Sequence, residues 1–393
     1  MDEAKQPLSP TIDLLNDLVG FDTTSHKSNL NIIEYIQKYL SHFGVNSELI
    51  PNTQGDKASL FATIGPKDKA GIGLSAHTDV VPVKDQNWSS PPFQLTEQDG
   101  KLYGRGTCDM KGFLACVLAS VPNFTRRNLK IPIHLLLSYD EEIGCVGVRP
   151  MIAKLGAEFI KPKMVIVGEP SEMKIVNTHK GTTSFTTEVV GAEAHSSVLH
   201  LGVNAIVYAG QLISKLRLMG RELQQQNHNP RFSPPYTSVH IGKIAGGTAL
   251  NIVPKYCQFI WEIRNLPGDN PEHILKHFET YANEHILPEM QTTSPEAKIN
   301  TNHRNTVYDF HTANNTIGNE ITSLALNWTG QNTTHAVSYG TEAGFFEKAG
   351  CPSIICGPGS IEQAHKPDEY VSRTQLEKCM QFMQNLAEYA ETG

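Results

Sequence analysis

Apolar residues recur along the first half of the chain with two alternating patterns. Helical spacing of apolar side chains covers residues 10–43, begins again near Lys111 and returns at 147–155. Between these segments, short apolar runs typical of buried strands occupy 59–64, 71–75, 131–138 and 164–167. Strands that alternate with helices in this way predict a mostly parallel sheet covered by helices.

The pattern changes after about Gly181. Strand-like runs occupy 182–190, 236–241, 256–263 and 298–303, and helical spacing covers 202–218 and 272–285. This β-α-β-β-α-β order is that of a ferredoxin-like unit. Alternating helices and strands then return, with a helix at 319–325, a strand at 353–355 and a helix from Thr374. We therefore predict a catalytic α/β domain at 1–181 and 306–393, interrupted by an inserted α+β domain at 182–305.

Length and charge narrow the class of protein. A chain of 393 residues is long enough for two domains. Its 33 basic and 40 acidic residues give a net charge of −7, which argues against nucleic acid or an anionic membrane as the main partner. The apolar runs are too short to span a membrane, and the polar N-terminal segment does not resemble a signal peptide. Seven cysteines without a CxxC pair favour reduced thiols and a cytoplasmic location.

Polar side chains gather where the predicted strands end. His77 follows one strand, Glu141 and Glu142 follow another, and Glu169 follows a third. Because ligands of such sheets bind beyond the carboxyl ends of the strands, we expect these side chains to meet at one edge.

Two further residues, Asp109 beside a Gly-rich run and His365 in a later loop, complete a ligand set of imidazoles and carboxylates. Such a set suits zinc or a similar divalent ion. So many carboxylates at one edge would repel one another unless a cation neutralised them.

Five short segments carry a resemblance to a known family. They are SAHTDVVP from Ser75, GRGTCDMKG from Gly104, DEE from Asp140, GEP from Gly168 and QAHKPDE from Gln363. Together they resemble the site motifs of the M20 family of dinuclear-zinc amidohydrolases, which includes deacetylases, desuccinylases, aminoacylases and carboxypeptidases. The segments 95–111, 246–254, 261–268 and 357–370 resemble the branch that deacetylates N-acetylornithine.

The resemblance implies a zinc-peptidase-like catalytic domain with a mixed, mostly parallel sheet, and an inserted ferredoxin-like domain that acts as lid and dimerisation module. It also implies a role for each site residue. Asp109 would bridge two divalent ions, with Zn²⁺ the first expectation and Co²⁺ the second. His77 and Glu169 would hold one ion, and Glu142 and His365 the other. Asp79 would orient His77, Glu141 would be the general base, and the Asp109–Met110 peptide would be cis.

The reaction implied is hydrolysis of N2-acetyl-L-ornithine to acetate and L-ornithine by a metal-bridged hydroxide, with Glu141 moving the proton. Desuccinylation, general aminoacylase action and dipeptide cleavage stay open as alternatives within the family. A non-catalytic amino-acid-binding protein is an alternative from another class, although such a protein has no use for the base Glu141.

Substrate contacts are expected from residues of both domains. Arg264 would pair with the α-carboxylate, although a surface arginine is the alternative. Asn251 ends a Gly-rich run that lacks the Lys-Ser/Thr ending of a phosphate-binding loop, and the resemblance places it near substrate instead. Gly340 and Thr341 would lie near the substrate carboxylate. Lys180 would do so too, or would serve at the domain junction.

Two interpretations of His195 are open. His195 would cap the helix expected to begin near Gly202, or it would act in a homodimer. In the second reading, which comes from the resemblance, the inserted domains pair and His195 reaches the partner's site to stabilise the oxyanion.

Overall fold

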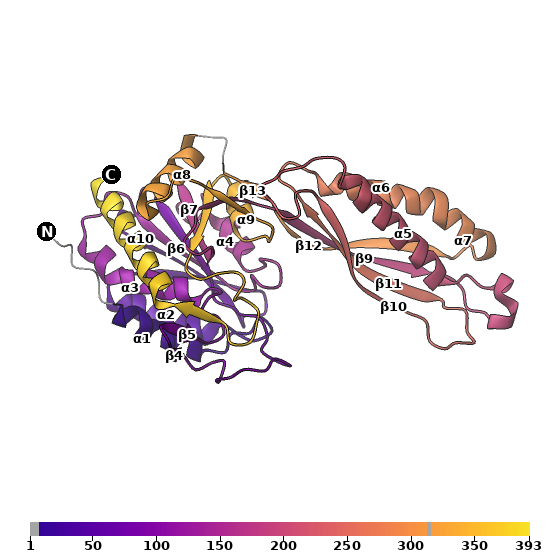
Figure 1. Ribbon diagram of the computed structural model, residues 1–393, viewed down its shortest axis with the longest axis horizontal. Coiled ribbons are helices and arrows are strands. Elements are labelled where there is room, and N and C mark those ends of the chain that lie inside the picture. Colours follow the sequence, from indigo (N-terminus) through magenta and orange to yellow (C-terminus); the bar gives the residue numbers. More distant parts are fainter. Residues whose placement is uncertain (1–7, 313–315) are drawn as a thin grey trace. The chain divides into compact units, whose positions relative to one another are not determined.

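The computed structural model describes residues 8–312 and 316–393 (Figure 1). The chain forms two compact units. The larger comprises the chain up to Thr178, residues 310–336 and Thr341–Gly393, and the smaller comprises His179–Asp309 with Val337–Gly340. Within the described ranges, no helix is both long enough and apolar enough to cross a membrane.

The larger unit is an α/β structure. Its helices are α1 (Ser9–Gly20), α2 (Leu30–His42), α3 (Lys111–Arg126), α4 (Val148–Lys154), α8 (Thr316–Thr329), α9 (Ala343–Lys348) and α10 (Arg373–Thr392). Its strands are β1 (Ser47–Pro51), β2 (Ala58–Ile64), β3 (Ile72–His77), β4 (Thr96–Gln98), β5 (Lys101–Tyr103), β6 (Ile133–Ser138), β7 (Met164–Pro170), β8 (Val176–His179), β13 (Phe310–His311), β14 (His335–Val337), β15 (Ser353–Gly357) and β16 (Tyr370–Ser372).

The main sheet is mixed, with a parallel centre. Its strand order is β1-β2-β6-β3-β7-β15-β8-β13, and β14 pairs with β8. The four central strands β6, β3, β7 and β15 run parallel, whereas β2 and β8 are antiparallel to their neighbours β6 and β15. A small sheet, β16-β5-β4, lies apart from it. The prediction of a mixed, mostly parallel sheet is confirmed.

Alternation along the central strands separates the core from the polar edge. On β3, Leu74 and Ala76 belong to the hydrophobic core that α1, α2, α3, α8 and α10 cover. Ser75 and His77 therefore point to the opposite face, because side chains of a strand alternate. α9 begins directly after Glu342, whose carboxylate accepts hydrogen bonds from Ser75 and Ser138, so this helix lies on the face of His77.

The smaller unit has the ferredoxin-like order. It consists of β9 (Gly181–Val190), the 3₁₀ helix η1 (Ser196–Leu201), α5 (Ala205–Leu223), β10 (Ser238–Gly246), β11 (Tyr256–Asn265), α6 (Pro271–Tyr281), the π-helical turn η2 (Ala282–Ile286), α7 (Leu287–Thr293) and β12 (Lys298–Val307). The antiparallel sheet order is β10-β11-β9-β12. α5 and α6 cover one face of it, where Phe185, Phe259 and Trp261 form a separate core with Leu212 and Phe278 (Figure 1).

Two sequence predictions of helices need correction. The helical stretch at 10–43 is two helices, because the Asp22 carboxylate accepts hydrogen bonds from the backbone and hydroxyl of Thr24 and turns the chain out of α1. The helix predicted from Gly202 begins at Ala205, where the side chain of Asn204 accepts hydrogen bonds from the amides of Ile206 and Val207.

Candidate active site

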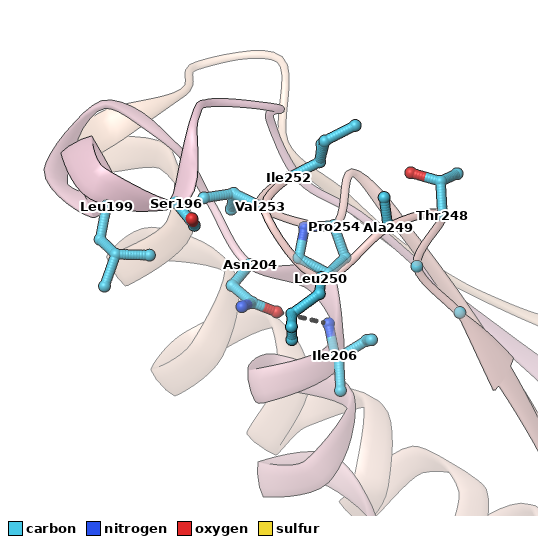
Figure 2. A pocket seen from close by; sticks show the side chains of 12 residues that line it. Ser196, Leu199, Asn204, Ile206, Thr248, Ala249, Leu250, Ile252, Val253 and Pro254 are labelled. Carbon is cyan, nitrogen blue, oxygen red and sulfur yellow. Dashed lines mark hydrogen bonds between the residues drawn. The ribbon is translucent and has the colours of Figure 1, made fainter.

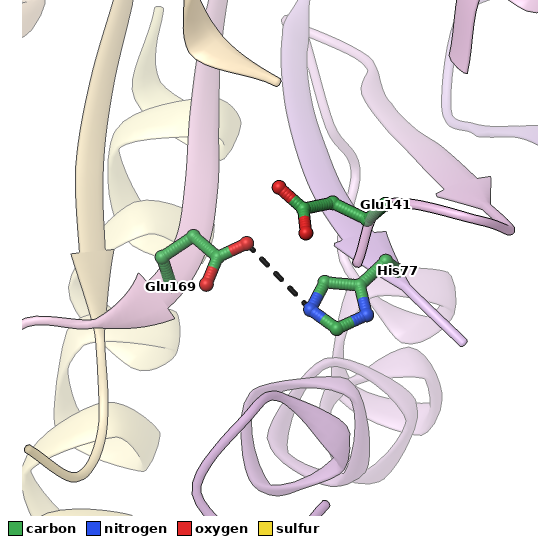
Figure 3. Close-up of side chains that lie close together, drawn as sticks. All are labelled: His77, Glu141 and Glu169. Atoms are coloured by element: carbon green, nitrogen blue, oxygen red, sulfur yellow. Dashed lines mark ion pairs between the residues drawn. The ribbon is translucent and has the colours of Figure 1, made fainter. Parts of the chain in front are cut away.

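The parallel strands of the larger unit bring three predicted site segments together. His77 is the last residue of β3 and pairs in register with Ser138, the last residue of β6. Glu141 and Glu142 follow β6 in a short loop, and Glu169 lies near the end of β7, the other neighbour of β3. Figure 3 shows His77, Glu141 and Glu169 directed toward one another.

Two loops complete the cluster. Asp109 lies two residues before the start of α3, and its peptide bond with Met110 is cis, as the resemblance implied. His365 lies between β15 and β16. The structure thus brings together all five residues expected to hold metal, with Glu141 beside them.

Asp109 lies between the two imidazoles. Its Oδ1 is 3.0 Å from Nε2 of His77, and its Oδ2 is 3.2 Å from Nε2 of His365. On one side, His77 Nε2 is also 3.6 Å from Glu169 Oε1, and on the other, His365 Nε2 is 3.0 Å from Glu142 Oε2. The cluster therefore has two halves that share one carboxylate.

Burial and mutual repulsion act on the carboxylates. Burial raises the pKa of Glu169 well above its ordinary value, and the negative charge of Asp109 adds to the effect. Burial and Asp109 likewise raise the pKa of Glu142 to about 7. Burial also raises the pKa of Glu141, although His77 opposes the rise. Oε1 of Glu142 and Oε1 of Glu169 are buried without a hydrogen-bond partner. Unpartnered carboxylate oxygens that repel one another favour a bound cation.

The same negative field acts on the imidazoles. Burial alone lowers the pKa of His77, but hydrogen bonds with Asp109 and Asp79 raise it well above its ordinary value. Hydrogen bonds with Asp109 and Glu142 raise the pKa of His365 to about 10. A pocket that stabilises positive charge on both histidines also suits divalent ions, and this donor set fits zinc.

Asp79 holds residues of the cluster in place through hydrogen bonds. The ring nitrogen Nδ1 of His77 is 2.9 Å from the backbone carbonyl of Asp79 and 3.5 Å from its carboxylate. The carbonyl, rather than the carboxylate that the sequence suggested, is therefore the nearer acceptor for His77. The carboxylate of Asp79 accepts hydrogen bonds from the amides of Glu141 and Glu142 and from the hydroxyl of Ser25. Asp79 thus fixes both the imidazole and the loop after β6.

A buried ion pair holds the two ligand loops. One oxygen of Glu369 accepts hydrogen bonds from Arg105, at 2.6 Å, and from the Gly106 amide. Its other oxygen accepts hydrogen bonds from the amides of Cys108 and Asp109. Glu369 belongs to the same loop as His365, so this carboxylate ties together the loops that carry two expected ligands.

Three buried groups beside the cluster are not among the site residues predicted from the sequence. Glu342 accepts hydrogen bonds from Ser75, at 2.9 Å, and from Ser138. The ion pair of Arg105 and Glu369 is the second group, although both residues lie inside quoted motifs. Cys145 is the third group. Its thiol donates a hydrogen bond to the Glu141 carboxylate at 3.3 Å. Burial raises the pKa of this thiol well above its ordinary value. The available signal was a position inside a motif for Arg105 and Glu369, and a position three residues after the DEE motif for Cys145.

The expected substrate residues lie in several places. Thr341 belongs to the larger unit, where its hydroxyl accepts a hydrogen bond from the Ala343 amide. Gly340 lies in the smaller unit against Val307. Arg264 is on the sheet face of the smaller unit that carries polar side chains, and its Nε donates to Glu262 at 2.8 Å.

The side chain of Lys180 binds a loop of the smaller unit. Its ammonium donates hydrogen bonds to the backbone carbonyls of Pro234 and Tyr236, at 2.8 and 2.6 Å, and its side chain is buried. Burial lowers the pKa of this lysine, and the charge of Arg264 adds to the decrease. These contacts favour a structural role for Lys180.

His195 and Asn251 are neighbours within the smaller unit. His195 is exposed and caps η1, because its Nδ1 accepts a hydrogen bond from the Ser197 amide. It therefore caps a different helix from the one predicted. The Ser196 amide donates to the carbonyl of Asn251, and His195 pairs with Ile252 in an isolated bridge.

A pocket of about 560 Å³ opens beside these two residues (Figure 2). Its walls come from η1, the start of α5 and the Gly-rich loop. The lining is Ser196, Leu199, Asn204, Ile206, Gly246, Gly247, Thr248, Ala249, Leu250, Ile252, Val253 and Pro254. Most of these side chains are apolar, and Asn204 is occupied in capping α5.

The chain is similar over nearly its full length to known proteins that share one name. Acetylornithine deacetylase of Myxococcus xanthus is 34% identical over 371 residues, which cover 93% of each chain. The acetylornithine deacetylase of Yersinia pestis is 33% identical over 398 residues and 98% of each chain.

Solved structures share the fold at lower identity. A tripeptidase of Staphylococcus aureus superposes with a TM-score of 0.75 at 20% identity, over 99% of this chain and all of that one. A dinuclear metal binding peptidase of the M20 family from Bacillus subtilis gives 0.69 at 17% identity, over 98% of both chains.

The family model for Peptidase family M20/M25/M40 matches residues 73–389, which include the whole cluster around Asp109. The alternative of a non-catalytic binding protein does not hold beside relatives named acetylornithine deacetylase that match over nearly the full length. The chain belongs to the M20/M25/M40 peptidase family and is a hydrolase.

Proposed function

We propose that this enzyme hydrolyses the N-acetyl amide of N2-acetyl-L-ornithine to acetate and L-ornithine. The observation that carries the proposal is the identity of 33–34% with acetylornithine deacetylases over more than nine-tenths of the chain. The cluster of His77, Asp109, Glu141, Glu142, Glu169 and His365 supplies the groups that amide hydrolysis needs.

We propose two divalent ions, Zn²⁺ first and Co²⁺ second, for the two halves of the cluster. His77 and Glu169 would hold one, His365 and Glu142 the other, and Asp109 both. When bound, such ions polarise the amide carbonyl and make water more acidic. The raised pKa of Glu142 and Glu169 supports this assignment, because bound cations would relieve the repulsion that raises it.

Glu141 is the proposed general base. Its carboxylate takes a proton from the water that attacks the amide carbon, and it returns a proton to the leaving nitrogen when the C–N bond breaks. A base with a raised pKa suits this double task, because it must both accept and give up the proton near neutral pH. Asp79 keeps Glu141 in place through the backbone of the loop.

Recognition of the amino-acid part is assigned to the smaller unit and to Thr341. Arg264, whose side chain is 41% exposed, has donors left for a substrate carboxylate after its bond with Glu262. Asn251 and Gly340 are proposed contacts of the same substrate. Lys180 is the weakest of these assignments, because two carbonyls already hold its ammonium.

We also propose a homodimer formed through the smaller unit. Large apolar side chains are exposed on η1, the start of α5, the end of β10 and the Gly-rich loop. They are Leu199, Leu201, Ile206, Val207, Ile244, Leu250 and Ile252. Burial of these side chains against a second copy would stabilise a dimer. A cytoplasmic location is proposed too, because all seven cysteines are free and buried.

A substrate panel tests the activity. Purified enzyme reconstituted with Zn²⁺ or Co²⁺ is assayed on N2-acetyl-L-ornithine, N-acetyl-L-methionine, N-succinyl-L,L-diaminopimelate and a dipeptide. We expect the largest kcat/KM with N2-acetyl-L-ornithine. A larger value for any of the other three would assign the enzyme to that branch of the family instead.

Mixed dimers test the proposed role of His195. Glu141→Gln and His195→Ala are each expected to be nearly inactive as homodimers. Co-expression gives mixed dimers in which one site combines an intact Glu141 with His195 of the second copy, and activity should return there. Mixed dimers that form and stay as inactive as their parents would limit His195 to capping η1.

A further inference from the structure

A buried thiol contacts the proposed general base. Sγ of Cys145 lies 3.3 Å from Oε1 of Glu141 and donates the hydrogen bond, and Cys145 is only 1% exposed. Among the described residues, no other side chain donates a hydrogen bond to this carboxylate. Among the side chains that the structure describes, the thiol is therefore the hydrogen-bond donor that restrains where the Glu141 carboxylate points.

The backbone of the loop fixes the thiol in that place. The amides of Gly144 and Cys145 both donate to the carbonyl of Glu141, each at 2.8 Å. Arg149 anchors the other side, because its guanidinium donates to the carbonyls of Cys145, at 3.1 Å, and Gly144, at 2.8 Å. Cys145 adopts a left-handed conformation with φ of 54°. A side chain four residues after Glu141 is thus turned back toward its carboxylate.

The chemistry of a thiol suits this position. An ammonium or guanidinium beside Glu141 would hold the carboxylate firmly but would lower its affinity for the proton it must carry. A thiol is a weak, uncharged donor, so it orients one oxygen with little loss of basicity. With Oε1 restrained by Cys145, Oε2 is left for proton transfer. Fewer orientations of the base mean that more encounters have the reactive geometry.

We propose that Cys145 is a positioning residue, whose thiol orients the Glu141 carboxylate for proton transfer. The inference rests on the proposed function, because it assumes that Glu141 is the base. It adds to that function a residue that acts on the rate through its hydrogen bond to Glu141.

Kinetics provides the first test. Cys145→Ala removes the donor, and we expect kcat to fall about 3- to 10-fold at unchanged KM, the rate equivalent of one net hydrogen bond. Cys145→Ser restores a donor and should recover most of the loss. Cys116→Ala is the matched control, because Cys116 is also a buried thiol of the larger unit but faces the carbonyl of Leu376 at 3.9 Å. Metal content should be equal in all four proteins.

Infrared spectroscopy provides a readout that needs no turnover. Subtracting the spectrum of Cys145→Ser from that of the wild type isolates the S–H stretching band of Cys145. A carboxylate acceptor weakens the S–H bond and lowers the frequency, so the same band measured in a Glu141→Gln background should move to higher frequency. This measurement also serves if Cys145→Ala does not fold.

The two results separate the inference from the proposed function. An unchanged kcat in a folded Cys145→Ala enzyme, or a band that does not respond to Glu141→Gln, would overturn the role of Cys145. A band that responds as expected, in a wild-type protein that hydrolyses none of the tested amides, would overturn the proposed function instead.

Discussion

The two oxygens of Asp109 face two different imidazoles, and this geometry makes one carboxylate the centre of the cluster. A residue that served a single ion would need only one of these contacts. Hydrogen bonds from His365 and His77 lower the pKa of Asp109 even though burial would raise it. Asp109 is therefore the carboxylate that stays ionised, whereas the outer pair, Glu142 and Glu169, bears the repulsion.

Glu141→Gln and Glu142→Gln should separate two roles in neighbouring residues. Glu141→Gln keeps the size of the side chain but cannot accept the proton, so turnover should fall by about 10²–10⁴-fold while metal content stays intact. Glu142→Gln should instead lower the occupancy of one ion. Metal analysis and kcat for the two variants distinguish these outcomes, and an active Glu141→Gln enzyme would remove Glu141 as base.

His134 should make stability depend on pH. It is buried on β6, and burial lowers its pKa from the ordinary 6.5 to about 4. Between these values the unfolded chain binds a proton that the folded chain does not. The stability due to neutral His134 is therefore present above pH 6.5 and lost as the pH falls toward 4, by about 3 kcal/mol in total.

Denaturant unfolding at pH 7.5 and pH 4.5 checks this expectation. His134→Leu should show a smaller loss of unfolding free energy between the two pH values than the wild type. The exposed His273, replaced by Gln, is the control and should keep the wild-type difference. Equal losses in wild type and His134→Leu would show that other groups cause the acid sensitivity.

Residues of the cluster could be predicted because each follows an apolar run or lies in a short motif. His77 and Glu169 lie at strand ends that periodicity identifies, and the expected ligands do come together. Glu342 had no such signal. It reaches Ser138 across 204 positions of sequence, and only the folded chain brings them together. The same reason applies to the pairing of Arg105 with Glu369.

The sequence predicted the strands of the sheet better than it predicted where helices begin and end. A strand such as β7 has a continuous apolar run at 164–167, but the stretch between α1 and α2 carries ordinary polar residues. There the chain leaves the helix to serve the site, because Thr23 donates to the carbonyl of Thr78 and Ser25 donates to Asp79. A tertiary contact of this kind overrides local helical spacing.

The loops of Asp109 and His365 should depend on one ion pair. Glu369→Ala would leave Arg105 buried without its partner and would free the amides of Gly106, Cys108 and Asp109. We expect the free energy of unfolding to fall by about 3–5 kcal/mol. The exposed pair Arg373–Glu97 is the control, and Glu97→Ala should cost at most about 1 kcal/mol. If denaturant titrations gave the same decrease in unfolding free energy for both variants, the ion pair of Arg105 and Glu369 would not be important for these loops.

At the scale of the whole molecule, metal should stabilise one unit only. All residues of the proposed metal cluster belong to the larger unit, and the smaller unit has its own core. Removal of metal with a chelator should therefore accelerate hydrogen exchange at the ends of β3, β6 and β7, because binding energy is lost there. Exchange in β9–β12 should not change, and equal acceleration in both units would contradict separate stabilisation.

The order of strands in the larger sheet matters while the protein is being made. β15 lies between β7 and β8, yet it leaves the ribosome after the whole of the smaller unit. β9 and β12, the first and last strands of that smaller unit, are direct partners, with Thr182 opposite Val307, so a nascent chain can close it early. His365 and Glu369 emerge later still. A chain whose translation stops short of them lacks one proposed metal ligand and the carboxylate that holds Arg105, so we expect hydrolysis only after both residues have been made.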